Sequence, residues 1–305
     1  MKPFLELATT IKINDEVILK AEEGGFIIAE LVINEQSRRG RELAESVRSS
    51  LRERGIHTYE NKRSDDVSSV ECIIVAGGDG TVVCGIGDAI SRGLPVGIVP
   101  LGTFNDLART LGIPLGVDAA CDVIAQRHEC LIDVGTVNGH YFVNEASIGI
   151  SSRITRLQTP EIKQHFGLFG VVWTALRAFQ YSRAIHAEVS FDGKAQRLRT
   201  VQMTVANSDR FGGIFKVEDA AIDDGWLDLY SVDIKSFRQA FAIARAIFAG
   251  KHHHVPGFRQ LRSTQFDVRT KHPHHITADG EPAGVTPAIF RILPKTLRVF
   301  APPLA

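Results

Sequence analysis

The sequence predicts a two-part α/β protein, in which a doubly wound parallel sheet is followed by a mostly antiparallel β region. In the first part, short apolar runs alternate with loops and helical patterns, as in doubly wound sheets with right-handed crossovers. Beyond residue 130, strand-like runs follow one another directly, and Asn138-Gly139 separates two of them as a hairpin turn. We therefore expect an α/β domain over 1–130 and a β domain over 131–305, with the C-terminal segment a candidate to pack back on the first domain.

Composition describes an ordinary globular protein with enough chain for real cores. The chain has 305 residues, of which 44% are hydrophobic and 23% charged, and its net charge is zero. Zero net charge gives no electrostatic case for nucleic acid as a partner. No apolar run approaches the roughly 20 residues that span a bilayer, and no signal-peptide pattern is present. The four cysteines lack C-x-x-C spacing, which favours a reducing compartment. We expect a cytoplasmic protein that can touch a membrane surface without crossing it.

The predicted elements of the first part alternate between strand and helix. Strands are expected at Phe26–Ile33, Ile56–Tyr59, Cys72–Val75 and Val96–Val99. The first helix follows Ser37 as N-cap, carries Leu43, Val47 and Leu51 on one face, and ends at Gly55. Further helices are expected from about Val82 to Ser91, from near Asp106, and over Val117–Gln126. Glu60 to Val70 would be a shortened crossover, and residues 1–24 are left unassigned.

Consecutive strands dominate the second part. They are expected at Leu131–Val137, Tyr141–Glu145, Ile185–Phe191, Leu198–Asn207, Leu227–Val232, Thr264–Val268, His275–Ala278, Ile289–Leu293 and Leu297–Phe300. Two helical insertions interrupt them, at Ile162–Tyr181 and Ser236–Ala249. The first insertion is apolar nearly all round, which is typical of core packing and would also suit a wall for an acyl chain. Nearby arginines would meet anionic headgroups or form a solvated face. The clusters around His253 and His274 lack the spacing of a zinc site.

Two glycine-containing loops carry the strongest chemical signal. Each follows a predicted parallel strand, where α/β folds place ligands; the loops contain Gly77, Gly78, Asp79, Gly80 and Thr81, and then Gly102, Thr103, Asn105 and Asp106. Glycines let a backbone approach a phosphate closely, while Thr103 and Asn105 can donate to phosphate oxygens. An aspartate repels phosphate unless a cation lies between them, so the pair of aspartates predicts a Mg²⁺–nucleotide site.

A third acidic stretch, Asp279-Gly280-Glu281, follows the strand His275–Ala278. Asp-Gly favours a two-residue hairpin turn, and the sequence alone leaves a turn and a functional role equally open. Asp192-Gly193 is interpreted only as a turn.

Five ordered motifs resemble those of the bacterial diacylglycerol kinase-like lipid kinases. They are Gly77–Thr81, Pro100–Arg109, Asn144–Gly149, Asp223–Leu227 and Asp279–Glu281, and the resemblance runs from about residue 26 to the C-terminus. It implies an N-terminal nucleotide domain resembling phosphofructokinase, a C-terminal antiparallel β-sandwich, and an active site in the cleft between them.

The resemblance also implies a role for each motif. Asp79 and Asp106 would organise Mg²⁺ around the phosphates of ATP, Thr103 and Asn105 would contact the nucleotide, and the first glycine loop would shape its cradle. Asp279 would accept the lipid hydroxyl proton, with Glu281 in support. Asp224 would hold a second, structural Mg²⁺ with the backbone carbonyls of Ala221 and Trp226. In the first loop, Asn34 and Ser37 match the family pattern, and Arg39 stands where the family has lysine.

Three functions follow as hypotheses. The first is an ATP- and Mg²⁺-dependent kinase acting on diacylglycerol or a related glycerolipid at a membrane surface, with a homodimer as one assembly to consider. The second changes the acceptor to a sphingoid or ceramide-type lipid or to NAD, although the Pro100–Asp106 loop argues against NAD. The third is a non-catalytic nucleotide- or lipid-binding regulator, suggested by Glu35 and Arg38 in the first loop and by Val83-Cys84, where the family has Asn-Glu.

Overall fold

A computed structural model of the chain describes residues 27–59, 70–150, 184–211, 215–216, 220–234, 239 and 257–303. The chain divides into two compact units, one made of Met1–Leu131 with Leu297–Ala305 and the other of Ile132–Thr296. Several expectations lie outside the described residues: those for residues 1–24 and 60–69, for both helical insertions, for the arginines near the first of them and for the histidines around His253.

The first unit is built on parallel strands in the order β2-β1-β3-β4. Their bounds are Ile56–Tyr59 for β2, Ile27–Ile33 for β1, Cys72–Gly77 for β3 and Val96–Pro100 for β4. Every residue of β3 and β4 is buried, as expected of parallel strands covered on both faces. The end of β18 (Ala288–Phe300) lies parallel to β4, with Val299 beside Val96.

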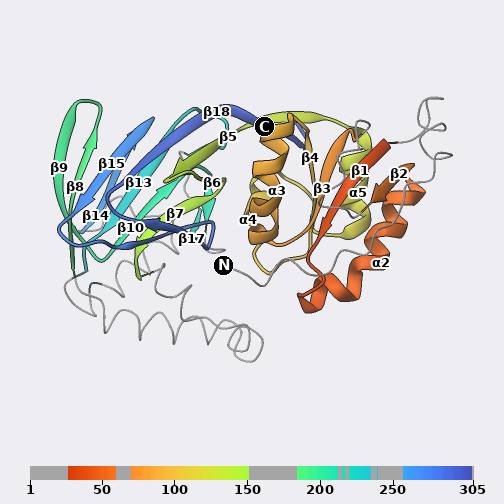
Figure 1. Cartoon of the computed structure of the whole chain (residues 1–305), viewed down its shortest axis with the longest axis horizontal. Coiled ribbons are helices and arrows are strands. Elements are labelled where there is room, and N and C mark those ends of the chain that lie inside the picture. Colours follow the sequence, from red (N-terminus) through yellow and green to blue (C-terminus); the bar gives the residue numbers. More distant parts are fainter. Residues whose placement is uncertain are drawn as a thin grey trace. The chain divides into compact units, whose positions relative to one another are not determined.

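Helices cover both faces of this sheet, which confirms the doubly wound prediction (Figure 1). They are α2 (Arg38–Glu53), α3 (Asp79–Arg92), α4 (Asp106–Thr110) and α5 (Val117–Gln126). A Cβ on Gly85 of α3 would lie 2.8 Å from Val75, whereas one on Gly97 of β4 would lie 3.0 Å from Ile124 of α5. Gly97 pairs with Ile74, so α3 and α5 contact opposite faces, because neighbouring strand residues point to opposite sides.

Helix α2 forms as its sequence predicts. The Ser37 hydroxyl accepts the backbone N–H of Gly40 at 2.9 Å, which confirms Ser37 as N-cap. Val47 and Leu51 are fully buried, and the helix gives way to Gly55 at φ 72°. Helix α3 differs from the prediction, because it begins at Asp79 rather than near Val82. Gly78 is its N-cap, and an acidic residue in the first turn suits the positive end of the helix, so Asp79, Gly80 and Thr81 are helical and not loop residues.

The second unit contains two antiparallel layers, which confirms the predicted sandwich (Figure 1). One layer has the order β14-β13-β10-β7-β16-β17, with bounds Phe258–Ser263, Leu227–Val232, Gln202–Ala206, Glu145–Gly149, His275–Ala278 and Glu281–Val285. The other contains β18, β15 (Gln265–Thr270), β8 (Ile185–Phe191) and β9 (Lys194–Thr200), with β5 (Glu129–Val137) and β6 (His140–Phe142) beside β18. A small ribbon pairs β11 (Arg210–Phe211) with β12 (Phe215–Lys216).

The core of the second unit lies between these layers. Side chains from both sheets form one buried cluster, in which Phe142, Phe266 and Phe290 are fully buried. Gly135 faces Phe142 across the β5–β6 pair, and a Cβ there would lie 2.2 Å from the aromatic ring. The absence of a side chain at Gly135 therefore makes room for the phenylalanine.

Hairpin turns were predicted well, and strand limits less well. Asn138-Gly139 and Asp192-Gly193 both have positive φ at each residue, as type I′ turns require. The predicted strand Leu198–Asn207 was wrong: it is β9 and β10, because the chain changes sheets at Val201. The two last predicted strands are one, β18, while β14 and β17 were not predicted.

The predicted strand Tyr141–Glu145 was also wrong, because it is divided into β6 and β7. At the interruption, the backbone N–H groups of Val143 and Asn144 donate to the side chain of Asp279. A side chain from a distant segment therefore takes the place of a strand partner.

Within the part of the chain that the structure describes, no helix combines the length and apolar character needed to span a membrane.

Asp133 fixes three segments of the second unit. Its side chain is fully buried, and its two oxygens accept backbone N–H groups of Gly225 at 2.6 Å and Lys295 at 2.7 Å. We predict that Asp133→Asn, which points an amide N–H at one of these donors, lowers the free energy of unfolding by about 2 kcal/mol. Urea denaturation measures the change. The exposed neighbour Asp223 provides the control, because Asp223→Asn should stay within about 0.5 kcal/mol; equal losses in both variants would contradict the role of Asp133.

Candidate active site

Three loops meet at the carboxyl ends of β1, β3 and β4 in the first unit. They are 34–37, Gly77-Gly78 and 101–105, each leading into a helix. The backbone N–H of Leu101 donates to Gly77 O at 2.8 Å, and that of Asn34 donates to Ala76 O at 3.3 Å. The sequence predicted the two glycine loops at the same edge of a sheet, and backbone hydrogen bonds join them and loop 34–37 to that edge.

Two glycines let the second and third loops touch. A Cβ on Gly102 would lie 2.5 Å from Gly78 Cα, and a Cβ on Gly78 would lie 3.1 Å from Gly102 Cα. Gly77 is equally confined, because a Cβ there would lie 2.4 Å from the hydroxyl of Thr81 in α3. Each of these positions therefore requires glycine for close packing.

Asn105 shapes the third loop from within. Its Oδ1 accepts the Gly102 N–H at 2.8 Å, and its Nδ2 donates to Gly102 O at 2.9 Å. The residue is buried and has a left-handed backbone with φ 52°. Both polar atoms of its side chain thus hold the loop, whereas Thr103 beside it is exposed. Of the two residues predicted to contact a nucleotide, Thr103 has the more accessible side chain.

The first loop is organised by its own polar side chains. Asn34 Oδ1 accepts the backbone N–H groups of Gln36 and Ser37, and the Ser37 hydroxyl donates to Asn34 O at 2.9 Å. Arg39 is exposed and donates from Nη1 to Gly102 O at 3.4 Å. The side chain in the family's lysine position therefore lies against the third loop and brings a positive charge to it.

Asp79 and Asp106 lie at the starts of α3 and α4. The carboxylate of Asp79 accepts the backbone N–H of Leu107, which follows Asp106, at 3.3 Å. Burial raises the pKa of Asp79, and backbone hydrogen bonds from Leu107 and its neighbours partly oppose that rise. Asp106 is 7% exposed. The structure therefore brings these two predicted residues together, with one carboxylate in a costly environment for a negative charge.

In the second unit, Asp279 forms both a hairpin turn and an anchor. Asp279 and Gly280 have φ values of 44° and 86° between β16 and β17. The carboxylate accepts backbone N–H groups of Val143 at 2.6 Å, Asn144 at 3.0 Å and Glu145 at 2.9 Å. The turn is therefore present, and Asp279 also anchors the segment after β6, while its functional role stays a prediction. Glu281, two residues later, is exposed.

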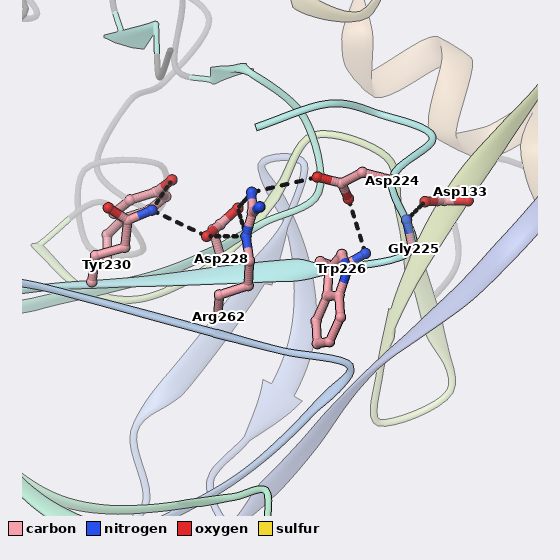
Figure 2. Close-up of polar contacts among 8 residues, drawn as sticks. Asp133, Asp224, Gly225, Trp226, Asp228, Tyr230 and Arg262 are labelled. Carbon is pink, nitrogen blue, oxygen red and sulfur yellow. Dashed lines mark hydrogen bonds and ion pairs between the residues drawn. The ribbon is translucent and has the colours of Figure 1, made fainter. Parts of the chain in front are cut away.

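The Asp224 turn carries the predicted structural metal ligands (Figure 2). Asp224 Oδ1 accepts the backbone N–H of Trp226 at 2.9 Å, and Asp224 Oδ2 lies 3.4 Å from Nη2 of Arg262. Burial raises the pKa of Asp224, while hydrogen bonds from Trp226 and Ala221 and the charge of Arg262 act against the rise. An arginine therefore supplies positive charge beside this carboxylate, and the described residues contain no group of three or more His, Cys, Asp or Glu side chains that could hold a metal ion.

Two residues that contact this turn, Asp133 and Arg262, were not predicted from the sequence. Asp133 lies in an apolar strand run, and a single acidic residue there was an available signal for a buried anchor. Arg262 opposes Asp228 across β13 and β14, a pairing that no local pattern reveals because β14 itself was not predicted.

Val83 and Cys84 of α3 depart from the family pattern. Val83 is half-buried and Cys84 is exposed, so neither belongs to the core.

Comparisons with known proteins agree with this architecture. Residues 29–137 match the diacylglycerol kinase catalytic domain, and residues 144–301 match the YegS C-terminal NAD kinase beta sandwich-like domain. The chain therefore belongs to the bacterial diacylglycerol kinase-like family of lipid kinases, and it is a phosphotransferase.

Individual relatives carry the same name. A diacylglycerol kinase of Staphylococcus carnosus (strain TM300) is 26% identical over 291 residues, covering 94% of this chain and 89% of the relative. One of Staphylococcus aureus (strain bovine RF122 / ET3-1) is 28% identical over 236 residues, covering 76% of this chain and 75% of the relative.

Solved structures share the fold. The crystal structure of a diacylglycerol kinase from Bacillus anthracis str. Sterne has a TM-score of 0.71 at 24% identity, covering 92% of this chain and 98% of that one. An NAD kinase from Archaeoglobus fulgidus, solved in complex with ATP, has a TM-score of 0.52 at 13% identity, covering 90% and 93%.

The contact between the glycine loops can be tested by adding a side chain. We predict that Gly102→Ser lowers the free energy of unfolding by about 1–3 kcal/mol, because its Cβ would meet Gly78 Cα. Gly116→Ser is the matched control: a Cβ there meets nothing within 4 Å, and serine is a good N-cap for α5. Thermal or urea unfolding compares the two variants, and similar stability in both would show that the loops separate easily.

Proposed function

We propose that this lipid kinase transfers the γ-phosphoryl group of ATP, with Mg²⁺, to a hydroxyl of diacylglycerol or a related glycerolipid. The observation that carries the proposal is the contact of two glycine loops that lead directly into Asp79 and Asp106 at the carboxyl ends of adjacent parallel strands. The names of the relatives support diacylglycerol as the acceptor.

The phosphates of ATP would lie against the two glycine loops. Exposed Thr103 and Arg39 can donate to phosphate oxygens, and the absence of side chains at Gly78 and Gly102 lets the two loops pack together. The helix that begins at Asp79 adds the positive end of its dipole. The presence of ATP in the structure of an NAD kinase with the same fold supports a nucleotide in this chain. Asn105 would contribute indirectly, by holding the 101–105 loop in the conformation that receives the phosphates.

Asp79 and Asp106 would hold Mg²⁺. Magnesium sites in kinases use one or two carboxylates and complete their coordination with substrate phosphates and water, so two aspartates suffice. The ion, when bound, neutralises charge on the phosphates during transfer. Burial of Asp79 without an ion is unfavourable, as the raised pKa indicates, and a nearby cation would relieve that penalty.

Glu281 is the better candidate to accept the lipid hydroxyl proton. Asp279 cannot turn toward a substrate without releasing three backbone N–H groups, and buried unpaired donors are costly. Glu281 is exposed and follows the turn that Asp279 forms, where its backbone pairs with Ala278. Asp279 would then be a positioning residue, which reverses the roles that the sequence suggested.

Since the acceptor is a lipid and the donor is ATP, the protein would work at the cytoplasmic face of a membrane as a peripheral enzyme. The homodimer stays a prediction.

A kinase assay on a panel of acceptors tests the function. Purified protein with ATP and Mg²⁺ is given diacylglycerol, a sphingoid base, ceramide and NAD, with lipids in mixed micelles and EDTA as control. We expect phosphate on diacylglycerol or a related glycerolipid and none in EDTA. Transfer to NAD alone would overturn the lipid assignment, and ATP binding without transfer to any acceptor would favour a regulator.

Paired substitutions separate Asp279 from Glu281. We predict that Glu281→Gln lowers kcat by about 10²–10⁴-fold with an unchanged unfolding midpoint, as loss of a general base does. Asp279→Asn should lower the midpoint as well, because an amide N–H would face the backbone donors. The exposed Asp223→Asn controls for removal of a surface charge. An inactive Asp279→Asn of native stability, beside an active Glu281→Gln, would identify Asp279 as the acceptor instead.

Asp79 should contribute to activity at the expense of stability. Its folded-state pKa is raised by burial, so the ionised carboxylate destabilises the fold above that pKa, and the penalty shrinks as the pH falls from the folded-state pKa to the lower unfolded-state pKa. We predict that Asp79→Asn, which keeps an acceptor for Leu107 N–H, is as stable as wild type or more stable by about 1 kcal/mol at pH 7, and loses at least about 100-fold in kcat/KM. Unfolding across pH measures this: a stability gain at neutral pH should shrink in acid, and a gain that grows in acid would contradict it.

A further inference from the structure

Arg262 lies at the centre of a charged cluster on the second unit (Figure 2). It stands on β14 directly opposite Asp228 of β13. Its Nε donates to Asp228 Oδ1 at 3.0 Å, and its Nη2 donates to Asp228 Oδ2 at 2.7 Å. Such a two-pronged pairing of guanidinium and carboxylate is geometrically specific. The same Nη2 lies 3.4 Å from Asp224 Oδ2, so one cation faces both carboxylates.

The partners of Arg262 restrain it on several sides. Asp228 is 2% exposed and also accepts a hydrogen bond from Gln260 at 3.1 Å. Gln260 opposes Tyr230 in the same strand pair and lies 3.5 Å from its hydroxyl oxygen. If Arg262 moved away, the buried carboxylate of Asp228 would lose its counter-ion, which is strongly unfavourable. The arginine is therefore part of the strand pair and not a free surface side chain.

Asp224 is arranged around this arginine and its own turn. One of its oxygens accepts the Trp226 N–H at 2.9 Å, and the other faces Arg262. The turn is fixed from its other side, because Gly225 N–H donates to the buried Asp133 at 2.6 Å (Figure 2). Asp224, Gly225 and Trp226 therefore each have a protein partner.

These contacts disagree with the metal site that the family resemblance implies. That site would use Asp224 with the carbonyl oxygens of Ala221 and Trp226. A divalent cation on Asp224 Oδ2 would stand close to a guanidinium that is always protonated, and like charges at such distances repel. Asp133, an acidic side chain bonded to the turn, accepts backbone N–H groups with both of its oxygens.

We propose that Arg262 is the built-in counter-ion of the Asp224 turn and takes the place that the family resemblance gives to a structural Mg²⁺. The second unit then needs no metal at this turn, while any Mg²⁺ used with ATP belongs to Asp79 and Asp106. The inference does not rest on the proposed function, because it concerns the folded protein without nucleotide.

Thermal unfolding of the wild-type protein in EDTA and in millimolar Mg²⁺, without nucleotide, tests the proposal. Asp224→Asn is the matched variant, since its remaining oxygen can still accept the Trp226 N–H and the Arg262–Asp228 pair is untouched. We expect Mg²⁺ to shift the unfolding midpoint of both proteins equally, or to leave both midpoints unchanged. A rise in the midpoint with Mg²⁺ in wild type that Asp224→Asn abolishes would overturn the proposal.

Removing the arginine should create a Mg²⁺ site at the Asp224 turn, which the wild type is proposed to lack. We expect Arg262→Gln to have a lower midpoint in EDTA and to gain a Mg²⁺-dependent rise, which the double variant Asp224→Asn/Arg262→Gln should lose. An Arg262→Gln protein whose midpoint does not rise in Mg²⁺ would argue against an exchange of arginine for metal.

If this variant does not fold, Tb³⁺ luminescence sensitised by Trp226 tests the same site in the wild type, with Trp226→Phe as control. No Trp226-dependent signal is expected, and a saturable signal that Asp224→Asn removes would overturn the proposal.

Discussion

Backbone N–H groups that leave the helices and strands must still find an acceptor when they are buried, and in this protein side-chain oxygens provide it. Ser37 accepts from Gly40, Asn105 from Gly102, Asp133 from Gly225 and Lys295, and Asp279 from the segment after β6. Each of these contacts fixes a turn or loop that no ladder could hold. The loops of the candidate site keep their shape for this reason.

This use of side chains divides the polar residues of the motifs into two kinds. The polar side-chain atoms of Asn105 and Asp279 form hydrogen bonds with the backbone, and these bonds hold a loop or turn in place. Asp79 is buried and accepts a long hydrogen bond from Leu107 N–H together with other backbone hydrogen bonds, and Glu281 is exposed. Residues that hold a loop or turn therefore stand in the same motifs as a residue whose side chain is accessible.

Charge is balanced differently in the two units. In the first, the carboxylate of Asp79 is desolvated beside the start of a short helix, an arrangement that favours a bound cation. In the second, Asp228 and Asp224 face Arg262, which stays charged at every physiological pH. The same residue type is thus desolvated without an arginine in one unit and paired with an arginine in the other, and the difference lies in the neighbour that each fold supplies.

The sequence by itself determined the strand–helix order of the first unit, the N-cap at Ser37, the type I′ turns and the identity of the glycine loops, because each depends on residues close together in the chain. Tertiary structure decided the rest. The strand predicted from Leu198 is divided because the chain passes from one sheet to the other. The Asp279 carboxylate accepts the backbone N–H of Val143, which follows β6. Whether a carboxylate is a base, an anchor or an arginine's partner depends on groups that lie tens of residues away, and only the folded chain brings them within hydrogen-bonding distance.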